Sequence, residues 1–188
     1  MAKNDYRLQS EWRIPARLGE VAGLIREAVE DVQIFVQHWP EANVAFRVLT
    51  PGLPGGLHRE LELSTKGFLP YRLRWRLKIT AAEFPHRYAF ASRGDFEGIG
   101  VWTIVAQGSH VVVRFEWCVR VHKPIVRVLS FWLRPLFVAN HRWAMAQGER
   151  RMIQLLEERR RETEPARCRF AAPPPRGNVA DIRQLANT

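Results

Sequence analysis

The sequence predicts an α+β fold in which a curved antiparallel sheet wraps around one long helix near the C-terminus. The first observation is residues 71–79, where large apolar side chains alternate strictly with arginine and lysine. Only an extended strand has a period of two residues, so this strand buries one face and exposes the other. Further stretches share this alternation, and a broad helical stripe follows residue 124. A curved sheet on one helix encloses space for an apolar ligand.

The N-terminal quarter of the chain predicts one strand followed by two short helices. Residues 6–14 mix apolar and polar positions as a strand does, and Pro15 suits the first turn of a helix. Apolar residues recur at helical spacing over residues 17–29, and residues 32–36 are expected to form a second short helix. Pro40 disfavours helix at the residue before it.

Six further strands are expected between residues 44 and 122. They are residues 44–50, 58–66, 71–82, 87–93, 97–107 and 110–122. Glycine and proline at 51–56 predict a turn, Pro85 breaks the pattern, and Gly108 begins a two-residue hairpin turn. Gly98 and Gly100 permit a bulge or sharp curvature within their strand.

A long helix is predicted after Pro124, which fits the first helical turn. Its apolar stripe continues to about residue 161 and comprises Ile125, Leu129, Trp132, Leu136, Trp143 and Ile153. Pro135 is expected to kink this helix because it removes a backbone hydrogen bond. Residues 163–188 contain a proline run and few large apolar side chains, which predicts a flexible tail. The domain is therefore expected to span residues 5–162.

Composition indicates one globular domain that attracts anions without specificity. The chain has 188 residues, 46% of them hydrophobic and 26% charged, with a formal net charge of +10. Cys118 and Cys168 give neither metal-ligand spacing nor a disulfide framework. The N-terminus lacks an apolar run typical of a signal peptide, and no stretch has membrane-spanning length. We expect a cytoplasmic protein that needs no metal and no cofactor.

The order of elements resembles the START-like, or SRPBCC, superfamily, and in particular its bacterial polyketide cyclase/dehydrase-like branch. That order is strand, two helices, six strands and a long C-terminal helix. Local resemblance lies at residues 14–21, 38–40, 100–104, 111–121, 134–137 and 140–145, the last including Asn140-His-Arg-Trp143. The superfamily has the helix-grip fold and shares a cavity rather than a catalytic motif.

The resemblance implies a seven-stranded sheet that grips the final helix, with a ligand cavity between them. Strand alternation then assigns seven residues to the concave wall: Tyr71, Trp75, Tyr88, Phe90, Trp102, Phe115 and Trp117. Trp132, Leu136 and Trp143 are expected to face them from the helix. Aromatic residues also pack ordinary cores, so this composition alone does not require a cavity.

His141 is the candidate catalytic residue. If it points inward, it donates a hydrogen bond to a ligand carbonyl or acts as an acid or base. The alternative is a helix histidine paired with a backbone carbonyl that Pro135 leaves free. Asn140 either orients a ligand or fills the same gap in the backbone. No phosphate-binding loop, metal motif or nucleophile elbow accompanies them.

The cationic side of residues 72–78 suggests contact with nucleic acid or with an anionic membrane surface. However, a hairpin with residues 58–66 would place Glu60 and Glu62 opposite Arg74 and Arg76. This favours a solvated outer face of paired charges, without the aromatic side chains that stack on bases. At the next turn, we expect Arg93 to pair with Asp95 or Glu97.

Three functional hypotheses follow from these patterns. The leading one is a carrier or sensor that binds a bulky hydrophobic ligand: a lipid, an isoprenoid or quinone, or a polyketide-like molecule. The second is a polyketide cyclase or aromatase in which His141 transfers protons. The third is a basic adaptor on a membrane or nucleic acid, which added salt would release. No specific nucleic-acid partner is expected.

Overall fold

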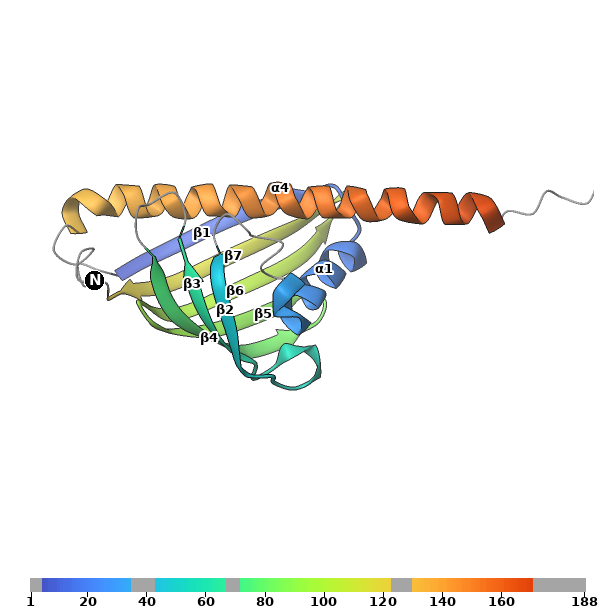
Figure 1. Cartoon of the computed structure of the whole chain (residues 1–188). Helices are drawn as coiled ribbons and strands as arrows, with labels where there is room; N and C mark the ends of the chain where they lie inside the picture. Colours follow the sequence, from blue (N-terminus) through green and yellow to red (C-terminus); the bar gives the residue numbers. More distant parts are fainter. Residues whose placement is uncertain (1–4, 35–42, 67–71, 123–129, 171–188) are drawn as a thin grey trace, which may run out of the picture. The chain divides into compact units, whose positions relative to one another are not determined.

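The computed structural model describes residues 5–34, 43–66, 72–122 and 130–170 (Figure 1). The chain divides into two units, Met1–Leu156 and Glu157–Thr188. The elements, with their bounds, are β1 Asp5–Ile14, α1 Leu18–Glu30, β2 Asn43–Thr50, η1 Pro54–Gly56, β3 Glu60–Thr65, β4 Leu73–Glu83, β5 Arg87–Gly94, β6 Phe96–Gln107, β7 His110–Val121 and α4 Ser130–Phe170.

The seven strands form one antiparallel sheet, as predicted, in the order β1-β7-β6-β5-β4-β3-β2. From β2 to β7, neighbouring strands in the sheet are also consecutive in the sequence. Strand β1 instead pairs with β7, so the first and last strands of the sequence lie side by side. Within the first unit, the part of α4 up to Leu156 lies along the concave side of the curved sheet, and α1 lies at one end of the sheet (Figure 1). The expected helix-grip architecture is therefore confirmed.

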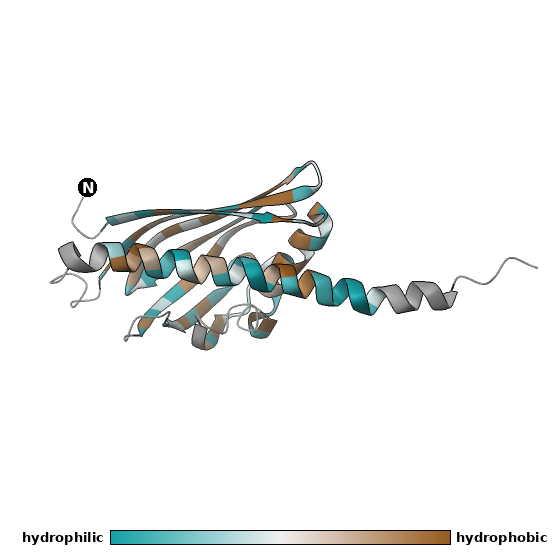
Figure 2. Ribbon diagram, turned by 90° about the horizontal axis from the view of Figure 1, so that it is seen from above, coloured by the Kyte–Doolittle hydropathy of each residue, from teal (hydrophilic) through white to brown (hydrophobic). Residues whose placement is uncertain are grey.

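Alternation along the strands produces the two faces of the sheet. In β4, Leu73, Trp75, Leu77 and Ile79 are buried, and the cationic residues between them are exposed. Figure 2 shows the same alternation of hydrophobic and hydrophilic residues along the strands. The buried side chains belong to one continuous core, which α1 and α4 also enter. Apolar burial on this face is the main stabilising term of the first unit.

Two glycines of β6 allow neighbouring atoms to approach its backbone closely. A Cβ at Gly98 would overlap the backbone of β7 at Cys118, and a Cβ at Gly100 would overlap the ring of Phe90. The sequence predicted a bulge or curvature at these positions, and the unbroken pairing of β6 with β5 and β7 shows that no bulge occurs at them. The ring of Phe90 therefore lies over bare backbone at Gly100.

Helix α1 is capped at its start and is tied at its end to the connection between β2 and β3. At its start, the Glu20 carboxylate accepts a hydrogen bond from the Arg17 N–H at 2.7 Å, which satisfies an orphan donor. At its end, the Arg59 guanidinium donates to the carbonyl of Glu30 and, at 2.8 Å, to that of Pro51. Residues 32–34 continue as helix, and the remainder of the predicted second helix lies outside the described residues.

Helix α4 faces the sheet with a different stripe from the predicted one. Its buried side chains in the first unit are Phe137, Met145, Met152 and Leu156. Leu136 is instead exposed, which corrects the prediction that it faces the sheet. The sequence argument followed one apolar stripe, and Leu136 of that stripe lies beside the inner position, which Phe137 occupies. The helix continues through Pro135 without interruption, and the predicted start near Pro124 lies outside the described residues.

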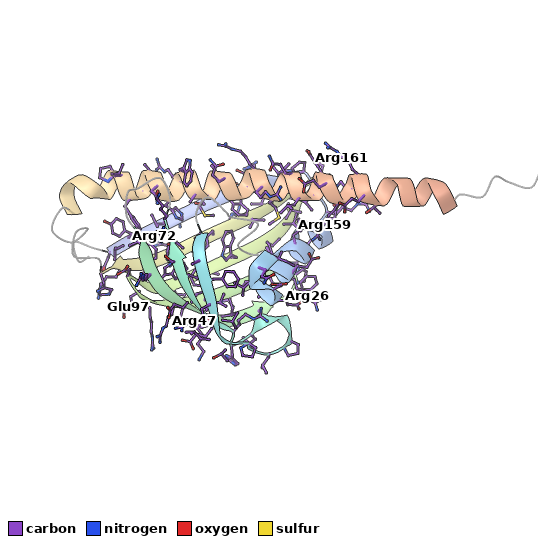
Figure 3. The ribbon with its side chains drawn as sticks, in the orientation of Figure 1. Arg26, Arg47, Arg72, Glu97, Arg159 and Arg161 are labelled. Atoms are coloured by element: carbon purple, nitrogen blue, oxygen red, sulfur yellow. The ribbon has the colours of Figure 1, made fainter. Side chains whose placement is uncertain are left out.

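The second unit is described as far as residue 170, where α4 ends. Within it, the Thr163 hydroxyl donates to the Arg159 carbonyl at 2.7 Å, and Arg161 lies 3.8 Å from Glu157, one turn away (Figure 3). These contacts between successive turns support helix. The helix thus passes the predicted end near residue 161 and includes the start of the segment expected to be a flexible tail.

The outer face of the sheet carries cations beside carboxylates. Glu62 lies opposite Arg76 in the register and contacts both Arg76, at 3.7 Å, and Arg47, at 3.2 Å (Figure 3). Glu60 lies opposite Lys78 instead of an arginine, because the β3–β4 register is shifted from the predicted one by two residues. Such exposed pairs contribute roughly 0–1 kcal/mol each. They neutralise charge locally more than they stabilise the fold.

The turn between β5 and β6 differs from the expected ion pair with Arg93. Glu97 instead contacts the His122 imidazole at 2.6 Å. The Asp95 carboxylate accepts a hydrogen bond from the Arg74 N–H at 2.9 Å, and the Asp95 carbonyl accepts one from the His122 N–H. The acidic residues therefore tie this turn to β4 and to the end of β7.

Gly98 of β6 provides a test of this close approach. We expect Gly98→Ala to lower the free energy of unfolding by about 2 kcal/mol or more, because the added methyl group meets backbone that cannot move. Gly23→Ala is the matched control, since no atom lies near its Cβ position in α1. Alanine there should raise stability by about 0.5–1 kcal/mol. Urea denaturation measures both, and equal effects at the two positions would contradict the role of Gly98.

Candidate ligand-binding cavity

A cavity of about 250 Å³ lies in the first unit between the concave face of the sheet, α1 and α4. Strands β4 to β7 supply most of the lining residues that come from the sheet. The sheet residues that line it include Trp75, Tyr88, Phe90, Trp102, Phe115 and Trp117. These are six of the seven sheet positions assigned to the wall from strand alternation. The seventh, Tyr71, lies outside the described residues.

The aromatic wall is a connected set of rings. Trp102 stacks on Phe115 with ring centroids 4.3 Å apart and an interplanar angle of 18°. Trp75 lies 6.2 Å from Phe90 and 5.9 Å from Trp117. Aromatic pairs in these arrangements are attractive beyond their buried area. The wall is therefore held in shape by contacts among its own members.

Helix α4 supplies the opposite wall through residues three or four apart. Phe137, Asn140, His141, Met145 and Met152 line the cavity. Met side chains adapt to irregular shapes, which suits a wall that faces a ligand.

Of the four predicted ligand-binding residues on this helix, only Asn140 lines the cavity within the described side chains. Leu136 is 39% exposed and does not line it. Trp143 is half-buried and also lies outside the lining. The side chain of Trp132 lies outside the described residues. The wall positions of Leu136 and Trp143 are thus corrected to Phe137 and Met145.

His141 contacts β1 through a residue that the sequence argument did not single out. Its Nε2 lies 3.2 Å from the Ser10 hydroxyl, and its ring lies 6.0 Å from the Phe115 ring. Among the described contacts, Ser10 takes the place of the backbone carbonyl considered for this histidine. Ser10 occupies an inward position of β1 opposite Phe115, so strand alternation plus the β1–β7 pairing would have revealed it.

Burial controls the charge of His141. It lowers the pKa of the imidazole to about 4, so the ring is neutral near pH 7. A neutral ring in contact with a hydroxyl has one nitrogen left, which is a donor or an acceptor according to the tautomer. His141 is therefore suited to hydrogen bonding with a ligand and poorly suited to donating a proton as imidazolium.

The other polar groups of the wall are few. The Arg59 guanidinium is held by two backbone carbonyls, and the Trp75 indole N–H donates to the Thr65 hydroxyl at 3.2 Å. Burial raises the pKa of Tyr88, which keeps its hydroxyl protonated. Lys66 is exposed at the edge of the cavity. None of the lining residues in the described part of the chain is an aspartate or glutamate.

Metal binding and membrane crossing find no support in the described ranges. Among the side chains that the structure describes, those of residues 5–34, 45–66, 72–122 and 135–163, no three or more His, Cys, Asp or Glu residues are placed to hold a metal ion. No helix within these ranges combines the length and the apolar character that crossing a bilayer requires.

This combination of sheet, gripping helix and cavity defines the helix-grip fold. No family model matches the chain, and no curated protein matches it by sequence. Solved structures do match. Protein TTHA0849 from Thermus thermophilus is 19% identical with a TM-score of 0.62, over 80% of this chain and 99% of that one.

Two enzymes share the same fold. The Zhui aromatase/cyclase from Streptomyces sp. R1128 is 11% identical with a TM-score of 0.63, over 82% of this chain and 95% of that one. Norcoclaurine synthase from Thalictrum flavum was solved as a point mutant with a transition state analogue. It is 14% identical with a TM-score of 0.57, over 83% of this chain and 96% of that one. Identities this low establish the fold and leave the function open.

The buried imidazole predicts a pH dependence of stability. His141 titrates near 6.5 when unfolded and at about 4 when folded, so the unfolded state binds more protons between these values. The contribution of neutral His141 to the free energy of unfolding should therefore be complete above about pH 6.5. It should fall by up to about 3 kcal/mol as the pH drops to 4. In His141→Gln, this part of the decline should disappear. Denaturant titrations across pH 4–7 measure it, and parallel curves for the two proteins would contradict the prediction.

Proposed function

We propose that the chain binds a bulky hydrophobic molecule in the cavity and acts as its carrier or sensor. The observation that carries this proposal is a cavity of about 250 Å³ whose aromatic walls are formed by core side chains of the first unit. Protein interiors are close-packed, and unfilled space within a core lowers stability. A volume of this size, near the lower end of small-molecule sites, is consistent with a binding role.

Affinity in such a site comes from apolar burial, at about 25 cal/mol per Å² of surface removed from water. Asn140 and His141, on adjacent positions of α4, supply polar groups that orient the ligand. The wall suits lipids, isoprenoids or quinones, and polyketide-like molecules. A ligand with a carbonyl oxygen facing α4 would accept a hydrogen bond from neutral His141.

A cyclase or aromatase is the second candidate function. The Ser10–His141 contact in the wall supports it, as does the shared fold of the Zhui aromatase/cyclase. In this case the rings would hold a chain in a reactive shape, and His141 would move protons. The carrier is favoured because the described wall has no carboxylate to work with the histidine, and because burial disfavours the charged imidazole.

The first experiment is purification from the native host, followed by denaturation and mass spectrometry of the organic extract. The carrier hypothesis predicts one apolar molecule in near-stoichiometric amount. An empty extract from a folded, monomeric protein would contradict stable carriage and favour transient binding of a substrate. Assays with polyketide-like compounds would then test the cyclase.

Substitutions in the wall separate binding from catalysis. We expect Trp75→Ala and Trp102→Ala to lower ligand occupancy roughly tenfold or more, because each removes a large apolar surface. Trp143→Ala is the matched control, since it makes the same truncation outside the lining. His141→Ala should leave occupancy within about threefold, as expected for one hydrogen bond.

Occupancy in these variants is measured by mass spectrometry, with circular dichroism to verify folding. If His141→Ala abolished a measurable turnover and left occupancy unchanged, the carrier hypothesis would fail and the cyclase would replace it.

A further inference from the structure

Within the described residues, two charged side chains line the cavity, and both are cations: Arg59 and Lys66. The Arg59 guanidinium is held by the carbonyls of Pro51 and Glu30. Lys66 is exposed, and the structure gives it no hydrogen bond or ion pair with another described residue. An exposed residue in the lining marks the mouth of the cavity. A positive charge without a described partner therefore lies at this mouth.

The residue before Lys66 adds a hydroxyl group to the same lining. Thr65 ends β3 on the inner face of the sheet, opposite Leu73, and its side chain is half-buried. The Trp75 indole N–H donates to the Thr65 hydroxyl oxygen at 3.2 Å. A hydroxyl that accepts a hydrogen bond keeps its own O–H as a donor, and the structure gives this O–H no acceptor among the described residues. Thr65 thus offers a donor one residue away from the lysine, on an oxygen that Trp75 holds in place.

The mouth suits an anionic head group better than the interior does. A carboxylate taken fully into an apolar cavity would lose most of its hydration, which is costly. At the mouth it stays partly hydrated, while an apolar body attached to it is buried against the aromatic wall. The lysine stem is long and flexible, so its ammonium reaches such a head group without leaving water. No aspartate or glutamate among the described lining residues repels a carboxylate.

We infer that the ligand is an amphiphile with an apolar body and a carboxylate head, and that Thr65 and Lys66 hold this head at the mouth of the cavity. One carboxylate oxygen accepts a hydrogen bond from the Thr65 hydroxyl, and the other pairs with the Lys66 ammonium. The inference rests on the proposed function and narrows it. It favours fatty-acid-like and polyketide-like acids, and it disfavours neutral isoprenoids, quinones and amines.

The test uses probes with one alkyl chain and different head groups: decanoate, 1-decanol and decylamine. Their affinities for the full chain are measured by titration calorimetry near pH 7, where the acid and the amine are both charged. We expect decanoate to bind at least about fivefold more tightly than decanol, because hydrogen bonds to charged groups are the stronger ones. Decylamine should bind at least about fivefold more weakly than decanol, because its charge meets that of Lys66. Added salt should reduce both differences.

Variants assign the preference to the two residues. Lys66→Gln removes the charge and should lower the ratio of decanoate to decanol affinity about fivefold, with decanol affinity within about twofold. Lys78→Gln is the matched control, because it removes the same charge from an exposed position on the outer face of β4, and it should leave the ratio unchanged. Thr65→Val keeps the shape of the side chain without its hydroxyl and should lower the ratio about threefold. Thr65→Ser should restore it.

The opposite outcomes separate the inference from the proposed function. Equal effects of Lys66→Gln and Lys78→Gln on the ratio, or equal binding of decanoate and decylamine, would refute the inference and leave the proposed function standing. In the native extract, a carboxylic acid would support the inference, whereas a neutral molecule in near-stoichiometric amount would overturn it and support the carrier. If the folded protein bound none of the three probes, and its native extract were empty, the proposed function would fail together with the inference.

Discussion

The rest of the structure depends on one geometrical mismatch between a wide sheet and a narrow helix. Seven strands at about 4.8 Å spacing span roughly 29 Å, whereas a helix with its side chains is about 10–12 Å across. One helix can cover such a face only if the sheet curls around it. Even then, the strands farthest from the helix axis keep apolar side chains that α4 does not reach. The cavity is the space that remains after this curling.

The curled arrangement is secured at its margins by polar contacts. On one edge, β1 meets α4 through the Ser10–His141 contact and through the Arg13 N–H, which donates to the Glu149 carboxylate at 2.9 Å. At the far end, Arg59 joins the end of α1 to the connection after β2. Hydrogen bonds to charged groups are among the stronger ones. These polar contacts surround an interior in which contacts between aromatic rings dominate.

Strand positions and faces were predictable because alternation is a local property of the chain. The inward sides of Trp75, Phe90 and Trp117 follow from it directly. The helix was harder, since apolar residues surround α4 on several sides and the choice between Leu136 and Phe137 depends on contacts with the sheet. The contact of Ser10 with α4 could not be predicted from its strand alone, because it depends on the pairing of β1 with β7. Contacts between segments more than one hundred residues apart leave no periodic signal in the sequence.

The distribution of indole rings has an optical consequence. Four of the seven tryptophans, Trp12, Trp75, Trp102 and Trp117, line the cavity. Trp12 lies 5.1 Å from Trp102, and Trp75 lies 5.9 Å from Trp117. At such separations, excitation energy passes readily between rings, and indole emission changes with the polarity of its surroundings. Intrinsic tryptophan fluorescence should therefore report whether the cavity is filled.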